Sequence, residues 1–263
     1  MDINKFYAQE GEKPLDNLVS DGGFCGIFRT IGCIGDSLSS GEFETFDKKG
    51  ERRGYYDMFP YSWGQFMARK NGFEAYNFSR GGMTAKEYME SFAENSGFWD
   101  KEKACQAYVI ALGVNDVYSM NMEVGDISDI DEDYRKNKPT FLGYYAQIVA
   151  RYKEICPDAK FFFVTTPKEK PDTQDAKARA IRDALYALAD YFENAYVIDL
   201  YTYAPVYDEA FRETYFLYGH LSPAGYMLTA QLVDSYIDYI IRHNPMDFKF
   251  VGFIGTDIPY KFD

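Results

Sequence analysis

Short apolar runs alternate along the chain with longer amphipathic segments. Five runs have the length and composition of strands, at residues 27–34, 73–78, 107–112, 161–165 and 195–200. In the segment 175–193, apolar residues recur on one face with the 3.6-residue period of a helix. Strands that alternate with helices favour a single three-layer α/β/α domain with a five-stranded, mainly parallel sheet.

Helices are predicted at 62–71, 85–95 and 175–193, and a last one begins at Pro223. Ser222 has the side chain of a helix N-cap, and proline is favoured at the first helical position. Its apolar face would comprise Tyr226, Ala230, Val233, Ile237 and Ile240. These residues would pack that helix against the sheet.

Three segments do not follow this alternation of strands and helices. Residues 1–26 are polar and glycine-rich, and we expect an extension that packs on a domain spanning 27–245. Residues 246–263 are too apolar to hang free, and we expect them to pack on the domain or to form a subunit contact. Residues 41–60 are charged and glycine-punctuated, which predicts a long loop.

The acidic segment 117–139 raises the question of a calcium site. Asp129, Asp131 and Asp133 have the spacing with which a calcium loop begins. Tyr134 stands where the sharp turn of that loop needs glycine, and no glutamate follows at the required distance. We therefore interpret the segment as a solvated acidic insertion.

Charge and cysteine usage restrict the partners and the compartment. The formal net charge of −13 disfavours nucleic acid and anionic membrane surfaces as partners. No apolar run is long enough to span a membrane, and the first five residues contain no apolar signal segment. The four scattered cysteines indicate reduced, mostly buried thiols, so we expect a cytoplasmic protein.

Several cofactor classes lack support in the sequence. With two histidines and no paired cysteines, a zinc site is not expected. Neither a phosphate-binding G-x-x-x-x-G-K-[ST] motif nor a dinucleotide-binding G-x-G-x-x-G motif occurs. We therefore expect neither metal nor cofactor. The chain contains 24 Tyr and 22 Phe, and these would suit either a sugar-binding cleft or a large core.

Polar groups follow three of the predicted strands. Ser37 comes after the first strand, Gly82 after the second and Asn115 after the third. Because the carboxyl ends of parallel strands share one edge of a sheet, these groups can converge there. His220 lies just before the last helix. A serine, a histidine, a backbone N–H and an amide are the components of acyl-transfer chemistry.

The order and spacing of these residues resemble the SGNH hydrolases, also called GDSL esterases and lipases. Gly35-Asp36-Ser37-Leu38 is similar to the first block of that family, and the stretch from Asn77 through Gly82 to Thr84 to the second. Gly113-x-Asn115-Asp116 is similar to the third block, and His220 to the last. The resemblance implies a flavodoxin-like sheet and an ester hydrolase without metal or cofactor.

The resemblance also implies a role for each residue. Ser37 would be the nucleophile and His220 the base, and the N–H groups of Ser37 and Gly82 with the Asn115 amide would form the oxyanion hole. Taken one at a time, these residues also have ordinary explanations as turn or cap residues. The other histidine, His243, lies at the end of the last helix, where a positive charge suits the helix dipole, and is interpreted as structural.

One position departs from the family pattern. Members usually carry an aspartate three residues before the histidine, and here that position is Leu217. Either a backbone carbonyl orients His220 or a carboxylate arrives from elsewhere, and a Ser-His dyad is the working hypothesis. Four acidic residues nearby in sequence could supply that carboxylate, and nothing in the sequence ranks them: Asp199, Asp208, Glu209 and Glu213.

The leading hypothesis is a serine esterase that acts on a short acyl ester, such as the acetyl ester of a carbohydrate. A lipase or thioesterase of the same family remains open. The missing aspartate motivates a second class, a non-catalytic relative that binds a sugar or acyl ligand. A flavodoxin-like ligand-binding protein would share the fold but leave His220 and Asn115 unexplained. The sequence does not define the oligomeric state.

Overall fold

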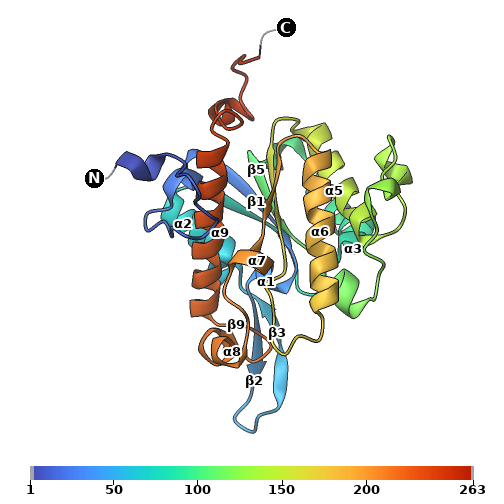
Figure 1. The fold of residues 1–263 in the computed structure, drawn as a ribbon. Helices are drawn as coiled ribbons and strands as arrows, with labels where there is room; N and C mark the ends of the chain where they lie inside the picture. The colour runs from blue at the N-terminus through green and yellow to red at the C-terminus, as the bar shows by residue number, and fades with distance from the viewer. Residues whose placement is uncertain (1–2, 262–263) are drawn as a thin grey trace.

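Five parallel strands form the central sheet of the computed structural model, which describes residues 3–261 (Figure 1). The strands lie in the order β4-β1-β5-β6-β7, and every neighbouring pair is parallel. Numbered along the chain within the sheet, this order is 2-1-3-4-5, the flavodoxin-like arrangement. The predicted sheet is thus confirmed. Its strands are β1 (Thr30–Gly35), β4 (Glu74–Ser79), β5 (Ala107–Ala111), β6 (Lys160–Val164) and β7 (Ala195–Ile198).

Helices cover both faces of the sheet and complete the predicted three layers (Figure 1). α2 (Trp63–Asn71) and α9 (Pro223–His243) pack together on one face. α3 (Ala85–Glu87), α5 (Phe141–Ile155) and α6 (Asp175–Tyr191) lie on the other. As predicted, Ser222 caps α9, its hydroxyl accepting a hydrogen bond of 3.2 Å from the N–H of Gly225.

The predicted helix at 85–95 is divided into three parts. Between α3 and α4 (Ala93–Asn95) the turns widen into the π-helical segment η4 (Tyr88–Phe92). Tyr88 is fully buried there and exchanges a hydrogen bond of 2.7 Å with Tyr152 on α5. Many other Tyr and Phe side chains are also buried in the core, which supports the large core as the explanation of the high aromatic content.

The prediction of a long loop at 41–60 is wrong. α1 (Ser37–Ser40) follows β1 almost immediately, and an antiparallel hairpin comes next, built from β2 (Glu42–Phe46) and β3 (Arg52–Asp57). The hairpin projects from the carboxyl edge of the sheet (Figure 1). It is anchored because Phe43 is buried, with its ring edge-on to the Tyr226 ring of α9 at a centroid distance of 5.7 Å.

A second, shorter hairpin lies against the first. β8 (Phe216–Leu217) pairs with β9 (His220–Leu221), and β9 packs against β2 and α1. These contacts bring His220 to the edge of the sheet where β1 ends. The connections and short helices not yet named are η3 (Phe59–Tyr61), η5 (Lys101–Lys103), α7 (Leu200–Tyr203) and α8 (Glu209–Tyr215).

The acidic insertion is solvated as predicted except at Asp129, since Glu123, Asp126, Asp131 and Glu132 are all exposed. It contains the short helices η6 (Val114–Ser119), η7 (Ile127–Asp129) and η8 (Tyr134–Lys136). Asp129 is buried, where it accepts hydrogen bonds from Lys138 at 2.8 Å and from Thr140 at 2.9 Å. The carboxylate therefore fixes the insertion to the start of α5.

Both chain ends contact the central domain. The N–H of Phe24, in η2 (Gly23–Ile27), donates to Asp238 of α9 at 2.8 Å, and η1 (Ile3–Phe6) precedes this segment. The predicted first strand starts only at Thr30 because η2 occupies its beginning. At the other end, Gln106 donates to the carbonyl of Val251 in η9 (Val251–Phe253). The predicted domain boundaries at 26 and 245 remain predictions, and residues 1–2 and 262–263 lie outside the described residues.

Candidate active site

Ser37 occupies the first position of α1, directly after β1. The carboxyl group of Asp36 caps this short helix by accepting a hydrogen bond of 3.1 Å from the N–H of Leu38. At a helix start the backbone N–H groups have no intrahelical partner, so the N–H of Ser37 is free to serve an incoming oxygen. The Ser37 side chain is half-buried.

Gly82 and Asn115 come together beside the end of β4. Gly82 lies in a turn with a φ of 72°, a conformation that favours glycine, and it is exposed. The side-chain amide of Asn115 donates to the carbonyl of Met83, the next residue, at 3.1 Å. Behind them, the buried carboxyl group of Asp116 accepts hydrogen bonds of 2.9 and 3.1 Å from the N–H of Ala85. The loops after β4 and β5 are thereby held together.

His220 lies at the same edge but does not contact Ser37 through a hydrogen bond. Its Nε2 atom lies 3.1 Å from Oε1 of Glu42, and its Nδ1 atom is buried without a hydrogen-bond partner among the described residues. Burial lowers the pKa of His220, and the negative charges of Glu44 and Asp57 oppose that shift. The neutral imidazole, which a general base must be, is therefore favoured.

None of the four carboxylates nearest in sequence reaches His220. Asp199 caps α7 by accepting from the N–H of Thr202 at 3.0 Å, and Asp208 caps α8 by accepting from the N–H of Phe211, also at 3.0 Å. Glu209 and Glu213 lie on α8 and form no ion pair with the histidine. Leu217 pairs with His220 across the small hairpin and is 39% exposed. The position of the usual aspartate thus has no acidic group.

Glu42, on β2, is the site residue that the sequence did not reveal. Its carboxylate spans from His220 to Gly81, where a side-chain methyl group in place of the glycine hydrogen would overlap the Oε2 atom. Burial raises the pKa of Glu42 to about 7, and the negative charges of Asp57, Asp36 and Glu44 add to the shift. The only sequence signal for Glu42 would have been the alternation of charged residues with Phe43, which would have predicted a strand at 42–46.

Other hydrogen bonds tie the hairpin to the candidate nucleophile. The hydroxyl of Tyr226 donates to the carbonyl of Glu42 at 2.8 Å and lies 3.5 Å from the carbonyl of Ser37. Asp57 accepts from the hydroxyl of Ser40 and, at 3.3 Å, from the N–H of Gly81. The base of the β2–β3 hairpin is therefore part of the site.

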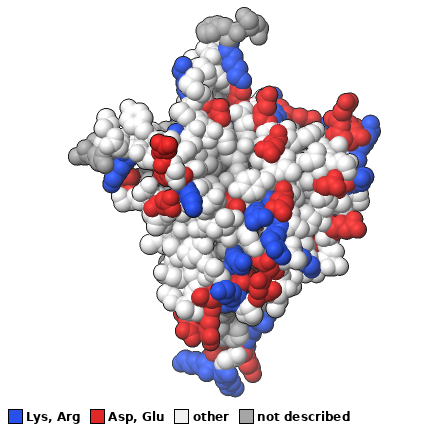
Figure 2. All heavy atoms as spheres, viewed as in Figure 1, with Lys and Arg blue, Asp and Glu red and all other residues white. Residues whose placement is uncertain are grey.

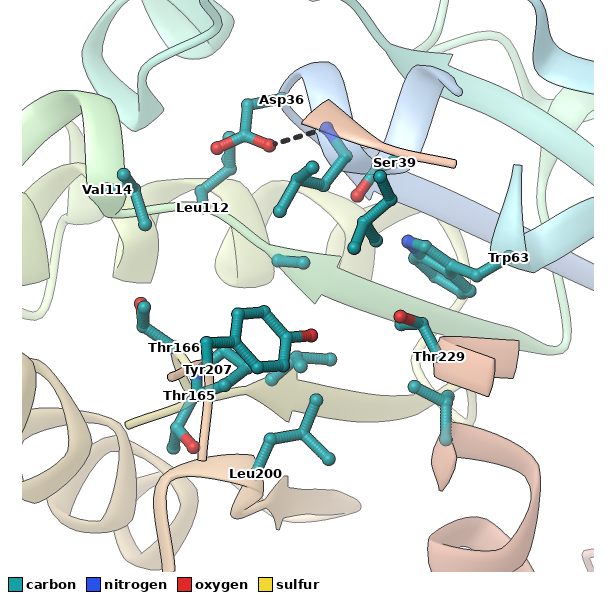
Figure 3. Close-up of a pocket in the computed structure, with 16 residues that line it drawn as sticks. Asp36, Ser39, Trp63, Leu112, Val114, Thr165, Thr166, Leu200, Tyr207 and Thr229 are labelled. Carbon is teal, nitrogen blue, oxygen red and sulfur yellow. Dashed lines mark hydrogen bonds between the residues drawn. The ribbon is translucent and has the colours of Figure 1, made fainter. Parts of the chain in front are cut away.

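A cavity of about 80 Å³ lies behind α1 (Figure 3). Asp36 and Ser39 line it on one side, and Tyr207 and Leu200 lie across from them (Figure 3). Its other walls are largely apolar, from the ends of β5 and β6 and from α9. Since a cavity needs about 10–15 Å³ to hold one water molecule, this one has room for a group of several non-hydrogen atoms.

The other histidine lies away from this site. His243 stacks on the Tyr239 ring at 3.9 Å, and its Nδ1 lies 2.8 Å from the Tyr239 carbonyl at the far end of α9. Within residues 3–261, no group of three or more His, Cys, Asp or Glu side chains is arranged to hold a metal ion. Lys and Arg side chains gather at the tip of the β2–β3 hairpin, whereas acidic side chains are spread over the visible face (Figure 2).

The site thus lies where the fold places ligands. In a sheet of this order, the topological switch point falls between the first and third strands, here β1 and β5. Ser37 and Asn115 follow those two strands, and Gly82 and His220 approach from either side. The fold is thus a doubly wound α/β sheet with a serine and an asparagine at its switch point.

The chain belongs to the GDSL-like Lipase/Acylhydrolase family, whose sequence pattern it matches over residues 33–228. It is therefore a hydrolase of ester bonds. No sequence among the curated proteins matches the chain. None of the helices within residues 3–261 combines the length and the hydrophobicity that crossing a bilayer requires.

Solved structures share the fold at low sequence identity. A protein of the lipolytic G-D-S-L family from Desulfitobacterium hafniense has a TM-score of 0.53 and 15% identity, over 79% of this chain and 99% of its own. A family two carbohydrate esterase from Clostridium thermocellum, in complex with cellohexaose, has a TM-score of 0.55 and 19% identity, over 91% and 67%. A carbohydrate acetylesterase from Sinorhizobium meliloti has a TM-score of 0.50 and 15% identity, over 81% and 99%.

Proposed function

We propose that the protein is a serine esterase that removes a short acyl group, such as acetyl, from a hydroxylated alcohol. The convergence of Ser37, Gly82 and Asn115 on one edge of the sheet, with His220 on β9 packed against α1, carries the proposal. Structural neighbours that act on carbohydrate esters agree with this substrate class, although at their identity they share only the fold.

In the proposed reaction, Ser37 Oγ attacks the carbonyl carbon of the ester while His220 accepts the hydroxyl proton. The negative oxygen is met by the N–H groups of Ser37 and Gly82 and by the Asn115 amide, which has a second N–H besides the one bonded to Met83. Collapse of this intermediate expels the alcohol, to which His220 returns the proton. Water then hydrolyses the acyl-serine by the same steps.

His220 has to change partner for this reaction. Its Nε2 atom lies 3.1 Å from Oε1 of Glu42 in the structure, and base catalysis requires a hydrogen bond from Ser37 to the same ring. α1, which carries Ser37, and β9, which carries His220, pack against each other, so the two side chains start from neighbouring elements. A substrate group that lies against the Glu42 carboxylate in place of His220 would free the imidazole.

The cavity behind α1 supports a short acyl group. Asp36 and Leu38, the chain neighbours of Ser37, line it, and its volume of about 80 Å³ suits a short acyl group better than a fatty acyl chain. The rate constant kcat/KM for p-nitrophenyl esters should therefore be highest between acetyl and butyryl. A maximum at octanoyl or longer would instead favour the lipase alternative.

Replacement of the nucleophile tests the proposal. Ser37→Ala should lower kcat for p-nitrophenyl acetate by at least about 10³-fold, because the acyl-serine can no longer form. Ser91→Ala is the matched control and should retain activity. It removes a hydroxyl on η4 that donates to the Glu87 carbonyl. A fluorophosphonate probe should label wild type at Ser37. Turnover that survives in Ser37→Ala would contradict the assignment, and absence of turnover with retained ligand binding would favour the non-catalytic alternative.

A further inference from the structure

The Glu42 carboxylate lies between His220, the candidate base, and the turn at Gly81 and Gly82, whose N–H would help to form the oxyanion hole. Oε1 lies 3.1 Å from His220 Nε2, and Oε2 packs on Gly81, whose missing side chain leaves the room. The backbone of Glu42 is fixed by the hydrogen bond of 2.8 Å from Tyr226. The Glu42 side chain is only 12% exposed, so its carboxylate is largely enclosed by the protein.

No Lys or Arg side chain among the described residues pairs with this carboxylate. In the part of the chain that the structure describes, His220 is the single basic side chain that pairs with Glu42. The nearby arginines are engaged elsewhere, Arg52 with Glu44 at 2.9 Å and Arg80 with Glu87 at 2.6 Å. When His220 turns toward Ser37 during the reaction, Glu42 loses the imidazole nitrogen that lies 3.1 Å from its carboxylate. A largely buried carboxylate without a donor is costly.

The alcohol half of the ester has to enter this same space, if the proposed function holds. His220 returns its proton to the leaving oxygen, so that oxygen and the carbon atoms attached to it lie beside the imidazole. Glu42 is the polar group that lies there already. Tyr55 of the same hairpin is 48% exposed and sets its ring edge-on to His220 at 5.7 Å, offering an apolar wall to the alcohol.

We propose that Glu42 determines specificity for the alcohol half of the substrate, selecting alcohols that carry further hydroxyl groups next to the ester. Such a hydroxyl donates to the carboxylate and takes the place of the imidazole that turns away. An alkyl alcohol would leave the carboxylate unpaired, and an anionic alcohol would face Glu42, Glu44 and Asp57 together. A site that provides a hydrogen bond to a substrate hydroxyl rejects the analogue that lacks it.

Two acetate esters with the same carbon skeleton test the proposal. Glycerol 1-acetate carries two free hydroxyl groups and propyl acetate carries none. The ratio of their kcat/KM values, measured by acetate release, should favour the glycerol ester by about ten- to hundredfold in wild type, because a hydrogen bond to a charged group has that effect. Glu42→Ala should lower the ratio at least tenfold, mainly through faster hydrolysis of propyl acetate.

Matched variants separate this role from a loss of structure. Glu51→Gln removes one negative charge from the exposed turn of the same hairpin and should leave the ratio unchanged. If the melting temperature shows that Glu42→Ala is unfolded, Glu42→Gln, which keeps the shape and loses the charge, should lower the ratio at least about threefold. Labelling by a fluorophosphonate reports that the site is intact.

A ratio that stays within about twofold of wild type in the folded Glu42 variants would overturn the proposal. So would a Glu42-dependent preference for acetylcholine over glycerol 1-acetate, because attraction to a cation without a hydroxyl would then explain the role of the carboxylate. Failure of the proposed function appears differently, as hydrolysis of both esters that persists in Ser37→Ala. The two results can therefore be told apart.

Discussion

Asp36 carries a buried carboxyl group next to the candidate nucleophile. Burial raises the pKa of Asp36 from 3.8 to about 6, while the hydrogen bond from Leu38 opposes the shift and the Asp116 charge adds to it. Because the folded state holds the proton more tightly than the unfolded chain, this group stabilises the fold fully below pH 4 and loses that contribution as the pH rises to about 6. Above pH 6 the fold contains a buried carboxylate.

Asp36→Asn should therefore become more stable, relative to wild type, as the pH rises. Asparagine keeps an oxygen that can accept from Leu38 and never ionises. The difference in free energy of unfolding should be small at pH 4 and should grow by about 2–3 kcal/mol by pH 7, following a shift from 3.8 to about 6. Urea titrations across this pH range measure it. Asp190→Asn, at an exposed position, is the control, and parallel pH curves for wild type and Asp36→Asn would contradict the prediction.

Individual residues were predictable from sequence where they follow a strand. Gly35 at the end of β1 pairs in register with Ser79 of β4 and Ala111 of β5, so the residues just beyond these ends had to meet. The partner of His220 was not predictable, because Glu42 reaches it through the contact between two hairpins. Nothing in the local sequence encodes that contact. The catalytic roles of Ser37, Gly82, Asn115 and His220 remain predictions.

At the scale of elements, the N-terminal segment is attached to α9 by a buried ion-pair network. Arg242 donates to Glu12 at 2.7 and 2.8 Å and to Asp238 at 2.8 Å, and the side chains of Arg242 and Glu12 are 4% and 3% exposed. The hydrogen bond from Arg242 lowers the pKa of Glu12 from 4.5 to about 2. That contribution to stability is present above pH 4.5 and is lost as the pH falls through about 2.

Arg242→Met should destabilise the protein by about 3–5 kcal/mol, because two buried carboxylates would lose their cation. Arg179→Met is the matched control. Arg179 also pairs with an aspartate one turn away, Asp175 at 3.1 Å, but its side chain is 55% exposed. An exposed pair contributes at most about 1 kcal/mol, so the control should change little. Equal losses in the two variants, measured by denaturant unfolding, would show that burial of the network has no special effect.

The elements themselves were predictable where their patterns are regular. The strands of the sheet are short apolar runs, and α9 begins at the expected cap, so local sequence and tertiary packing agree. The β2–β3 hairpin was missed because its strands are charged and only Phe43 marks a buried position clearly. The π-helical turns at 88–92 were missed because the pattern of that segment is still helical, and its wider turns depend on packing of Tyr88.

For the molecule as a whole, the four cysteines report on the integrity of the core. All four are free thiols, with exposures of 0% for Cys25 and Cys33, 1% for Cys105 and 8% for Cys156. Burial raises the pKa of Cys33 to about 12 and raises the pKa of each of the others. Since the thiolate is the reactive form, both access and ionisation protect these groups in the folded protein.

The folded protein should therefore resist a thiol reagent that modifies all four cysteines in denaturant. With a free energy of unfolding in the usual range of about 5–15 kcal/mol, the open fraction is below about 10⁻³, and the reaction should slow by at least that factor. Dithionitrobenzoate absorbance in buffer and in guanidinium chloride measures the two rates. Cys156 caps the end of α5 and is the most exposed, so any faster phase should disappear in Cys156→Ser. Rapid modification of a second thiol in the native protein would mean that the core opens locally around the sheet, and would contradict the prediction.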